Sequence, residues 1–190
     1  MDYDPNKRER ILNAAAQLII SSGLQTSMST IAAEAGVATG SLYNYFQSKE
    51  DLVFAVYQRV ATSLEADLLV EVDRALPYEE RVAQYVGNYV DHIWKDANRA
   101  MLYEVITNSP LVMQERLGGL FAKISSNSVE VFSEGLDLNA QRAMSPSLTG
   151  SFVRGSVRNV LKRHRAAGGE LTPQLRARII QMCLAALALR

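Results

Sequence analysis

The chain has few of the residues on which metal sites, disulfides and nucleophilic chemistry depend. Its 190 residues include one cysteine, Cys183, and two histidines, His92 and His164, which lie far apart in the sequence. It has no His-Glu-x-x-His motif, no cysteine pair and no glycine-rich phosphate loop following a strand. These absences exclude an internal disulfide and argue against an all-helical enzyme, so we expect no catalytic residue, no metal and no cofactor.

Long apolar runs are also missing. No stretch approaches the roughly 18 continuous apolar residues that a membrane-spanning helix needs, and residues 1–10 lack the apolar core of a signal peptide. Cys183 lies in an apolar run, so we expect it to pack inertly, and a single free thiol fits a reducing compartment. The sequence therefore predicts a cytoplasmic protein with no membrane partner.

A net charge is absent as well, because 20 Lys and Arg side chains balance 20 Asp and Glu. Three basic and four acidic side chains lie in residues 1–48, eight and fifteen in residues 49–137, and nine and one in residues 138–190. Nucleic-acid-binding surfaces are commonly basic. DNA binding by this chain would therefore depend on a few cations, hydroxyl groups and helix N-termini directed at phosphates.

Apolar residues recur at helical spacing through the chain, and no alternating pattern typical of a strand occurs. One example is the stripe of apolar residues at intervals of four from Leu52 to Leu68. We therefore expect an all-α fold. The longer helices are expected over residues 6–21, 49–74, 77–97, 111–134, 147–167 and 172–189, with an interruption of the fourth at Gly118-Gly119. A connecting segment, with or without a short helix, is expected over residues 135–146.

A segment near the N-terminus indicates two short helices around a tight turn, followed by the capped start of a third. Thr26 or Ser27 is suited to cap the first helix, and Gly36 is suited to end it in the left-handed conformation. We expect the second helix over residues 38–46 and Ser48 as the cap of the next. This layout suits a helix-turn-helix that places its second helix in the major groove of DNA, although a helical hairpin in a core gives the same pattern.

The same segment combines specific residues: Thr26, Ile31-Ala32, Ala35-Gly36-Val37, Gly40-Ser41-Leu42-Tyr43, Tyr45-Phe46 and Ser48-Lys49-Glu50. This combination resembles the tetracycline-repressor (TetR) family of transcriptional regulators, and the resemblance is confined to the N-terminal part of the chain. It implies a three-helix helix-turn-helix DNA-binding domain over residues 1–48. A helical ligand-binding and dimerisation domain would follow over residues 49–190.

By this resemblance, the second short helix is the recognition helix. Bases would be contacted by Thr39, Gly40, Ser41 and Asn44, phosphates by Thr26, Tyr43, Tyr45 and Lys49, and either one by Ser29. Many relatives carry Ser or Thr where this chain has Ala38, which cannot cap a helix. A helix that starts one residue later, with Thr39 as its cap, is the alternative to a base contact by Thr39.

One helix of the C-terminal part presents Tyr85, Tyr89 and His92 beside its apolar face. Together with Trp94 and Tyr103, these side chains are candidates to line a small-molecule pocket, since such pockets are mostly apolar with a few polar groups. The alternative is that the tyrosines fill the edge of the core and His92 is half exposed.

A later helix carries four basic side chains on one face: Arg154, Arg158, Lys162 and Arg165. A solvated stripe is the preferred interpretation, followed by pairing with acidic residues of another subunit. A site for an anionic ligand is placed last.

The last helix contains an apolar seam with steps of four, three, four and three: Leu175, Ile179, Met182, Ala186 and Leu189. This spacing is that of a coiled-coil seam. In the family that the N-terminus resembles, the last two helices of each subunit form a four-helix dimer interface. We therefore expect a homodimer at this seam.

The function that we expect is a ligand-responsive transcriptional repressor. A homodimer would bind a pseudo-palindromic double-stranded DNA operator, and a small-molecule inducer of unknown identity would release it. The alternatives are a small-molecule-binding or dimerisation protein without a DNA function and, more weakly supported, an all-helical enzyme.

Overall fold

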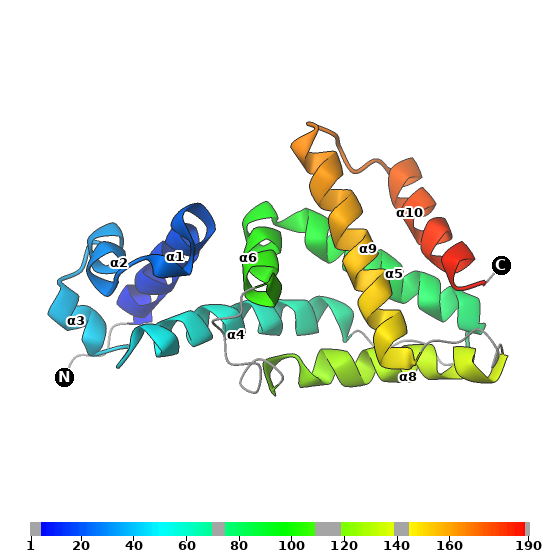
Figure 1. The fold of residues 1–190 in the computed structure, drawn as a ribbon, viewed down its shortest axis with the longest axis horizontal. Helices are drawn as coiled ribbons and strands as arrows, with labels where there is room; N and C mark the ends of the chain where they lie inside the picture. The colour runs from blue at the N-terminus through cyan, green and yellow to red at the C-terminus, as the bar shows by residue number, and fades with distance from the viewer. Residues whose placement is uncertain (1–4, 70–74, 109–118, 139–144, 189–190) are drawn as a thin grey trace. The chain divides into compact units, whose positions relative to one another are not determined.

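The computed structural model describes residues 5–69, 75–108, 119–138 and 145–188, and all regular structure in these ranges is helical (Figure 1). The predicted all-α class is therefore confirmed. The elements in chain order are α1 (Pro5–Ser22), the 3-10 helix η1 (Gly23–Gln25), α2 (Met28–Glu34), α3 (Thr39–Tyr43), α4 (Lys49–Leu68), α5 (Tyr78–Lys95), α6 (Ala97–Asn108), α8 (Ala122–Leu138), α9 (Pro146–Ala166) and α10 (Pro173–Ala186). Within the described ranges, no helix has both the length and the apolarity required to cross a membrane.

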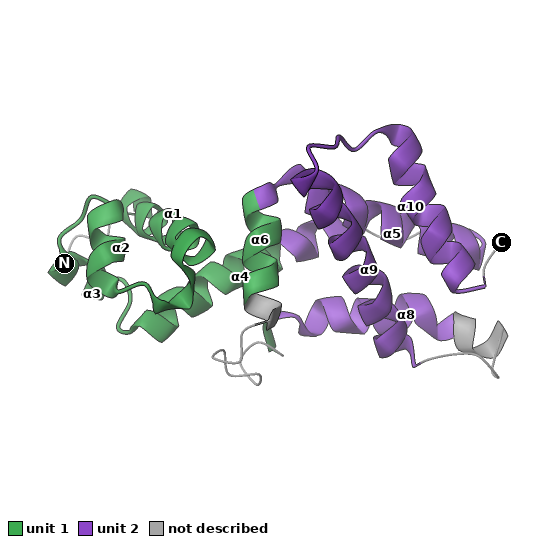
Figure 2. Cartoon of the chain, turned by 45° about the horizontal axis from the view of Figure 1, so that its top comes forward, with its two compact units in different colours: residues 1–62, 98–120 green, residues 63–97, 121–190 purple. Residues whose placement is uncertain are grey.

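The chain forms two compact units (Figure 2). Unit 1 contains residues 1–62 and 98–120, and unit 2 contains residues 63–97 and 121–190. The division falls inside α4, so this helix contributes residues to both units. These compact units are defined by contacts within the chain and not by function. The division into functional domains between residues 48 and 49 therefore stays a prediction.

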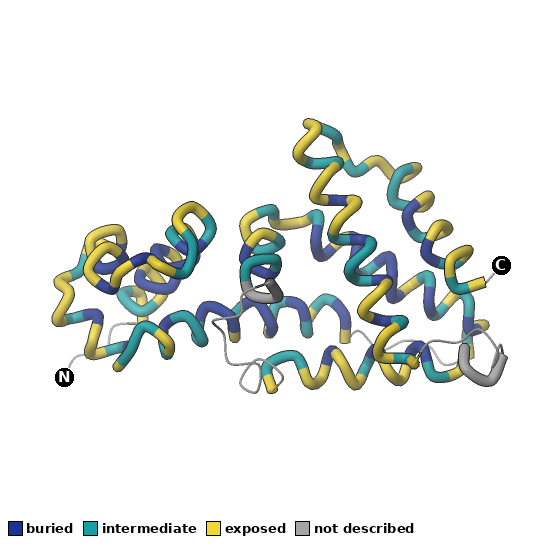
Figure 3. Tube along the Cα trace, in the orientation of Figure 1, coloured by how far each residue is buried: buried dark blue, intermediate teal, exposed yellow. Residues whose placement is uncertain are grey.

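Unit 1 is built around α1, which packs against η1 and α2, while α2 packs against α3. Ile11, Ala15 and Ile19 on the apolar face of α1 are buried. Figure 3 colours the chain by burial. Ile31 of α2 and Leu42 of α3 are buried as well. Burial of these side chains holds the two short helices, which are too short to be stable alone.

Unit 2 is a bundle in which α5 packs against α8, α9 and α10, and α8 packs closely against α9. The valines of α5, Val82, Val86 and Val90, are completely buried. Cys183 of α10 is also buried, as expected, and burial raises the pKa of its thiol. A neutral thiol is a poor nucleophile, which agrees with inert packing.

Two of the longer predicted helices end at the wrong residue. The helix that starts at Lys49 ends at Leu68 rather than at residue 74. Leu68 is buried, whereas Leu69, the first residue after the helix, is exposed. In addition, α8 runs through Gly135 to Leu138, where a connecting segment was predicted. A glycine inside a helix costs only about 1 kcal/mol, which the packing of α8 on α9 outweighs.

Candidate functional sites

The helix-turn-helix begins with a serine cap. The Ser27 side chain accepts a hydrogen bond from the backbone N–H of Thr30 at 3.1 Å, so Ser27 is the one of the two candidates that caps α2. The Thr26 hydroxyl instead donates to the Gly23 carbonyl at 3.1 Å, and the residue is 9% exposed. Thr26 therefore closes the preceding turn and positions the start of α2.

The turn after α2 has the predicted glycine at its centre. Gly36 has a φ of +64°, in the left-handed region. Its N–H donates to the Ala33 carbonyl at 3.1 Å, and the N–H of Val37 donates to the Ala32 carbonyl at 3.0 Å. This pair of bonds is the Schellman arrangement, which satisfies two of the terminal carbonyls of α2. The angle between α2 and α3 therefore depends on a residue that tolerates a positive φ.

The candidate recognition helix is shorter than predicted. It spans Thr39–Tyr43 rather than residues 38–46, because the next two N–H groups bond to carbonyls three residues back and tighten the chain into a turn. Ala38 occupies the cap position without a side-chain hydrogen bond, and Thr39 is the first helical residue. The alternative in which Thr39 caps the helix is therefore wrong, and Thr39 is exposed.

The outer face of α3 is polar and open. Leu42 and Phe46 point into the core with 0% and 4% exposure, whereas Tyr43 is 49% exposed. A Cβ added at Gly40 would meet no atom within 4 Å, so Gly40 is not required by packing in this chain. The remaining predicted DNA contacts comprise the exposed Ser29, Thr39 and Asn44 and the half-buried Ser41, Tyr45 and Lys49.

The helix that follows is fixed to this motif at its first turn. The Ser48 hydroxyl accepts a hydrogen bond from the Asp51 N–H at 3.0 Å and donates to the Asp51 carboxylate at 2.8 Å. Further along α4, Arg59 donates to Glu9 at 3.2 Å and to Asn13 at 2.8 Å, both on α1. These contacts hold the three-helix motif against the first part of α4.

In unit 2, three of the four basic residues predicted to form a solvated stripe on α9 donate hydrogen bonds to α5. Arg154 Nη1 donates to the hydroxyl of Tyr85 at 2.9 Å and to the hydroxyl of Ser128 on α8. One turn later, Arg158 Nη1 donates to the hydroxyl of Tyr89 at 3.0 Å. The preferred interpretation of these arginines as solvated is therefore wrong, because buried tyrosine hydroxyls accept their hydrogen bonds; Lys162, by contrast, is exposed.

Arg165 completes this row at the end of α5. Its guanidinium lies 4.4 Å from the centre of the Trp94 ring and donates to the carbonyls of Ile93 and Trp94 at 3.2 and 2.7 Å. These carbonyls are among those that a helix end leaves without intrahelical partners. Arg165 therefore caps α5, and Trp94 stacks with a cation from α9.

His92 is buried and paired. It is 4% exposed, and its Nδ1 lies 2.6 Å from Asp67 Oδ2 in the last turn of α4. The alternative that leaves His92 half exposed is therefore wrong. Of the five predicted ligand-lining residues, four belong to α5 in unit 2, whereas Tyr103 belongs to α6 in unit 1. Their role in ligand binding stays a prediction.

The predicted dimer seam on α10 divides into two parts. Ile179 is 4% exposed and faces its own chain, and Leu175 is half-buried. Met182 is 57% exposed and Ala186 is exposed as well, while Leu189 lies outside the described residues. The corresponding apolar side chains of α9 were missed, although their spacing could have revealed them: Leu148, Phe152 and Val160, which are 59%, 44% and 38% exposed.

The relatives of this chain agree with the geometry of its N-terminal motif. Residues 11–56, which contain α2, α3 and the start of α4, match the family described as "Bacterial regulatory proteins, tetR family". The N-terminal motif is that of the TetR family. The resemblance inferred from the helix-turn-helix residues is thus confirmed for this part of the chain.

Similarity to one curated regulator extends over most of the chain, and similarity to another covers less than half of it. It is 25% identical over 152 residues to the fatty acid metabolism regulator protein of Bacillus subtilis, with 73% of this chain and 77% of that protein aligned. An HTH-type transcriptional regulator of Haemophilus influenzae is 36% identical over 81 residues, which cover 42% of this chain and 43% of that protein.

The structure of AibR in complex with isovaleryl coenzyme A and operator DNA shares the fold. Its TM-score is 0.73 at 23% identity, and the alignment covers 93% of this chain and 97% of AibR. At this identity the likeness concerns the fold, and the ligand and DNA are those of AibR.

Proposed function

We propose that this TetR-family chain is a ligand-responsive repressor that binds a pseudo-palindromic operator as a homodimer and is released by a small molecule. The observation that carries the proposal is α3, a short helix with a buried apolar side and an open polar side after a Schellman turn. Such a helix fits the major groove, where small and hydrogen-bonding side chains read base edges. The proposed role of the protein is regulatory rather than catalytic. The protein would act in the cytoplasm, where bacterial operators are.

The DNA-binding domain of this proposal is residues 1–48, with the first residue of α4 added. Thr39, Gly40, Ser41 and Asn44 approach bases, and Tyr43, Tyr45 and Lys49 hold phosphates, with Ser29 available to either. Thr26 acts indirectly, because its hydroxyl is engaged by the Gly23 carbonyl and the residue is buried. Gly40 matters for its lack of a side chain, which lets the backbone of α3 come close to DNA.

The homodimer is formed by α9 and α10. Isolated apolar residues on a surface are ordinary, but Leu148 and Phe152 lie one turn apart on α9, and Met182 is exposed on α10. Exposed apolar side chains therefore occur on α9 as well as at the predicted seam positions Met182 and Ala186 of α10. Pairing the α9–α10 faces of two copies would bury them, as burial of apolar area favours association.

The effector that we propose is an acyl compound with an anionic group, such as an acyl coenzyme A. Two relatives support this class: the Bacillus subtilis protein is a fatty acid metabolism regulator, and AibR was solved with isovaleryl coenzyme A. The effector acts on residues 49–190, where α5 carries Tyr85, Tyr89, His92 and Trp94. A ligand that binds the released form more tightly shifts the population away from DNA.

A DNA-binding experiment tests the repressor proposal. The DNA upstream of the chain's own gene and of the adjacent genes is titrated with protein at two salt concentrations, and electrophoretic shifts are measured. We expect a sequence-dependent shift that weakens as salt increases, because phosphate contacts release counterions. A protein that forms dimers but shifts none of these fragments in a sequence-dependent way contradicts the proposal.

Substitutions locate the surface. Gly40→Leu, Tyr43→Ala and Lys49→Ala are expected to weaken the shift at least about tenfold, since each loses or blocks a contact worth about 1–3 kcal/mol. Lys95→Ala is the matched control, because Lys95 is an exposed lysine of α5 in unit 2. If Tyr43→Ala and Lys49→Ala bind as tightly as the parent, the assigned phosphate contacts are wrong.

A charge placed on α9 tests the dimer interface. Phe152→Glu should convert the dimer to monomers, because the interface would have to bury an unpaired carboxylate, and it should abolish operator binding. Sedimentation or light scattering measures the mass, and Gln17→Glu at an exposed position of α1 is the control for the added charge. A Phe152→Glu variant that remains dimeric would place the interface elsewhere.

A further inference from the structure

Three polar groups from three different helices of unit 2 converge on one point. Arg154 Nη1 of α9 donates to Ser128 of α8 and to Tyr85 of α5, and the two hydroxyls lie 3.0 Å apart. Both hydroxyl-bearing residues are only 1% exposed. A small-residue contact makes this possible, because a Cβ at Gly150 would lie 2.9 Å from the Ser128 Cβ and 3.0 Å from Arg154 Nη1.

The hydrogens of this cluster can be assigned one by one. Ser128 Oγ donates to the Ile124 carbonyl at 2.8 Å, so its lone pairs are free to accept from Arg154 and Tyr85. Tyr85 then donates to Ser128 and accepts from Arg154. Every hydroxyl hydrogen is therefore used within the protein, and the two hydroxyls act toward the arginine only as neutral acceptors.

The charge of Arg154 is not balanced by this arrangement. Among the described residues, no carboxylate forms an ion pair with Arg154, and both of its hydrogen bonds come from Nη1. Its Nε and Nη2 groups form an edge that makes no hydrogen bond to the described residues. Such an edge has the geometry that binds a carboxylate or phosphate through two parallel bonds. Arg154 is half-buried, where a charge interacts more strongly than in water.

The surroundings favour an anion further. The charged side chains of α9 are all basic, and Arg158 follows one turn later with its Nη1 on Tyr89. The nearest aromatic contact of Tyr85 is Phe132 of α8, edge-on with ring centres 5.4 Å apart. The carboxylate of Glu134 on α8 forms an ion pair with Arg81 of α5. A ligand here would meet a positioned cation beside aromatic rings.

We infer that the Nε–Nη2 edge of Arg154 is an anion-binding site that holds the carboxylate or phosphate of the effector, and that Tyr85 and Ser128 position it. This inference rests on the proposed ligand-responsive function and names the chemistry of its effector. The bound anion would contact Arg154 of α9, which is hydrogen-bonded to Tyr85 of α5 and Ser128 of α8. Binding of the effector is thereby connected to α5, which also carries His92 against the last turn of α4.

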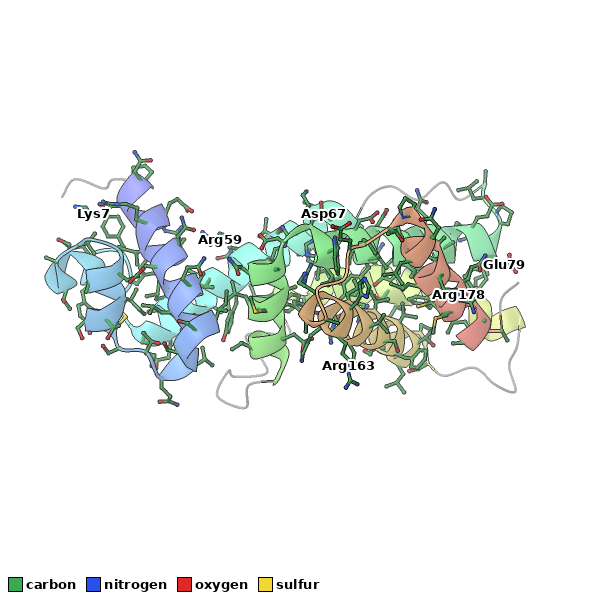
Figure 4. The ribbon with its side chains drawn as sticks, turned by 90° about the horizontal axis from the view of Figure 1, so that it is seen from above. Lys7, Arg59, Asp67, Glu79, Arg163 and Arg178 are labelled. Atoms are coloured by element: carbon green, nitrogen blue, oxygen red, sulfur yellow. The ribbon has the colours of Figure 1, made fainter. Side chains whose placement is uncertain are left out.

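Fluorescence of Trp94, the only tryptophan, provides a readout that does not involve DNA. Isovaleryl coenzyme A, palmitoyl coenzyme A, free palmitate and coenzyme A alone are titrated into the full-length protein. Binding of free palmitate identifies a carboxylate as the bound anion. If the coenzyme A compounds bind and free palmitate does not, the bound anion is a phosphate. The variants are Arg154→Met and, as a matched control, Arg163→Met, which removes an exposed arginine of the same helix that projects away from the bundle (Figure 4).

Arg154→Met should raise the dissociation constant about tenfold to a hundredfold, as expected for the loss of charged hydrogen bonds. Arg163→Met should leave it within about twofold, and neither change should weaken operator binding in the absence of effector. Unchanged affinity in Arg154→Met overturns the inference, as does failure of all four probes to bind the parent. In either case the operator shift still decides the proposed function by itself.

A purely structural role for Arg154 is distinguished by stability. Tyr85 and Ser128 remain hydrogen-bonded to each other without the arginine, so Arg154→Met should melt at or above the temperature of the parent. If Arg154→Met does not fold, the role is structural and the inference fails, unless Arg154→Lys folds and binds the probe at least about tenfold more weakly. Lysine keeps the charge but not the two-pronged edge.

Discussion

The two units differ in whether their buried tyrosine hydroxyls have a hydrogen-bond partner. In unit 1, Tyr57 is 0% exposed, and its hydroxyl has no hydrogen-bond partner among the described residues. Burial raises the pKa of Tyr57 to about 12. In unit 2, Tyr85 and Tyr89 are equally buried, but each accepts a hydrogen bond from an arginine of α9.

The same contrast extends to the candidate sites. In unit 1, the polar side chains of the candidate site lie on the surface. The polar side of α3 is open, while Leu42 and Phe46 face an apolar core. Unit 2 brings hydroxyl groups and guanidinium groups between its helices. The first arrangement suits a rigid surface that reads another molecule, whereas the second suits a site in which buried hydroxyl groups position a guanidinium group for a ligand.

Substitution of Gly150 should produce the largest effect on stability. Gly150→Ala places a Cβ 2.9 Å from the Ser128 Cβ, so α8 and α9 must separate. We expect the free energy of unfolding to fall by about 1–3 kcal/mol, measured by urea denaturation, together with weaker effector binding. An unchanged free energy of unfolding would show that α8 and α9 leave room for a methyl group at residue 150.

The tyrosine comparison can be sharpened by removing single hydroxyls. Tyr57→Phe should stabilise the fold by about 1 kcal/mol, because it removes a buried unpaired hydroxyl, and Tyr85→Phe should destabilise it by a similar amount. Denaturation of both variants beside the parent measures the difference. Equal effects of the two substitutions would erase the contrast between the units.

The alkaline limb of stability provides an independent check on Tyr57. Its folded pKa of about 12 lies above its ordinary value of 10.0. The folded state therefore keeps the proton longer, and the associated stability is complete below pH 10 and is lost as the pH rises toward 12. Tyr57→Phe should lose less stability than the parent over this range.

The smallest expected effect on stability is at Gly40. A Cβ there meets nothing within 4 Å, and alanine is the better helix former, so Gly40→Ala should stabilise the protein by at most about 1 kcal/mol. Operator binding should weaken nonetheless, because the added methyl group holds α3 away from the bases. A gel shift with the denaturation data separates the two effects, and unimpaired binding would mean that Gly40 does not approach DNA.

Most of the helix-turn-helix could be predicted from the sequence because its interactions are local. The Ser27 cap, the Gly36 turn and the Ser48–Asp51 pair join residues at most four or five apart. Side-chain type and spacing are therefore enough to specify them. The exception was the start of α3, where Ala38 takes the cap position without a side-chain bond and the hydroxyl of Thr39 is left outside.

The cluster in unit 2 could not be predicted in the same way. Arg154 and Tyr85 are 69 residues apart, and His92 and Asp67 are 25 apart. Helical spacing placed the arginines on one face of α9 without indicating what that face meets. Ser128 gave no signal of its own, because a serine inside a helix is ordinary until a neighbouring helix supplies a donor.

The amino-acid sequence by itself determined the all-α class, the helix-turn-helix and its family, since caps, turns and apolar periodicity act over a few residues. Tertiary structure alone decided that Arg154 and Arg158 of α9 point at buried hydroxyls and that Phe152 and Met182 remain uncovered in the single chain. The physical reason is that the direction of a charged side chain depends on the acceptors that another helix presents. Those acceptors become neighbours only when α5, α8 and α9 pack together.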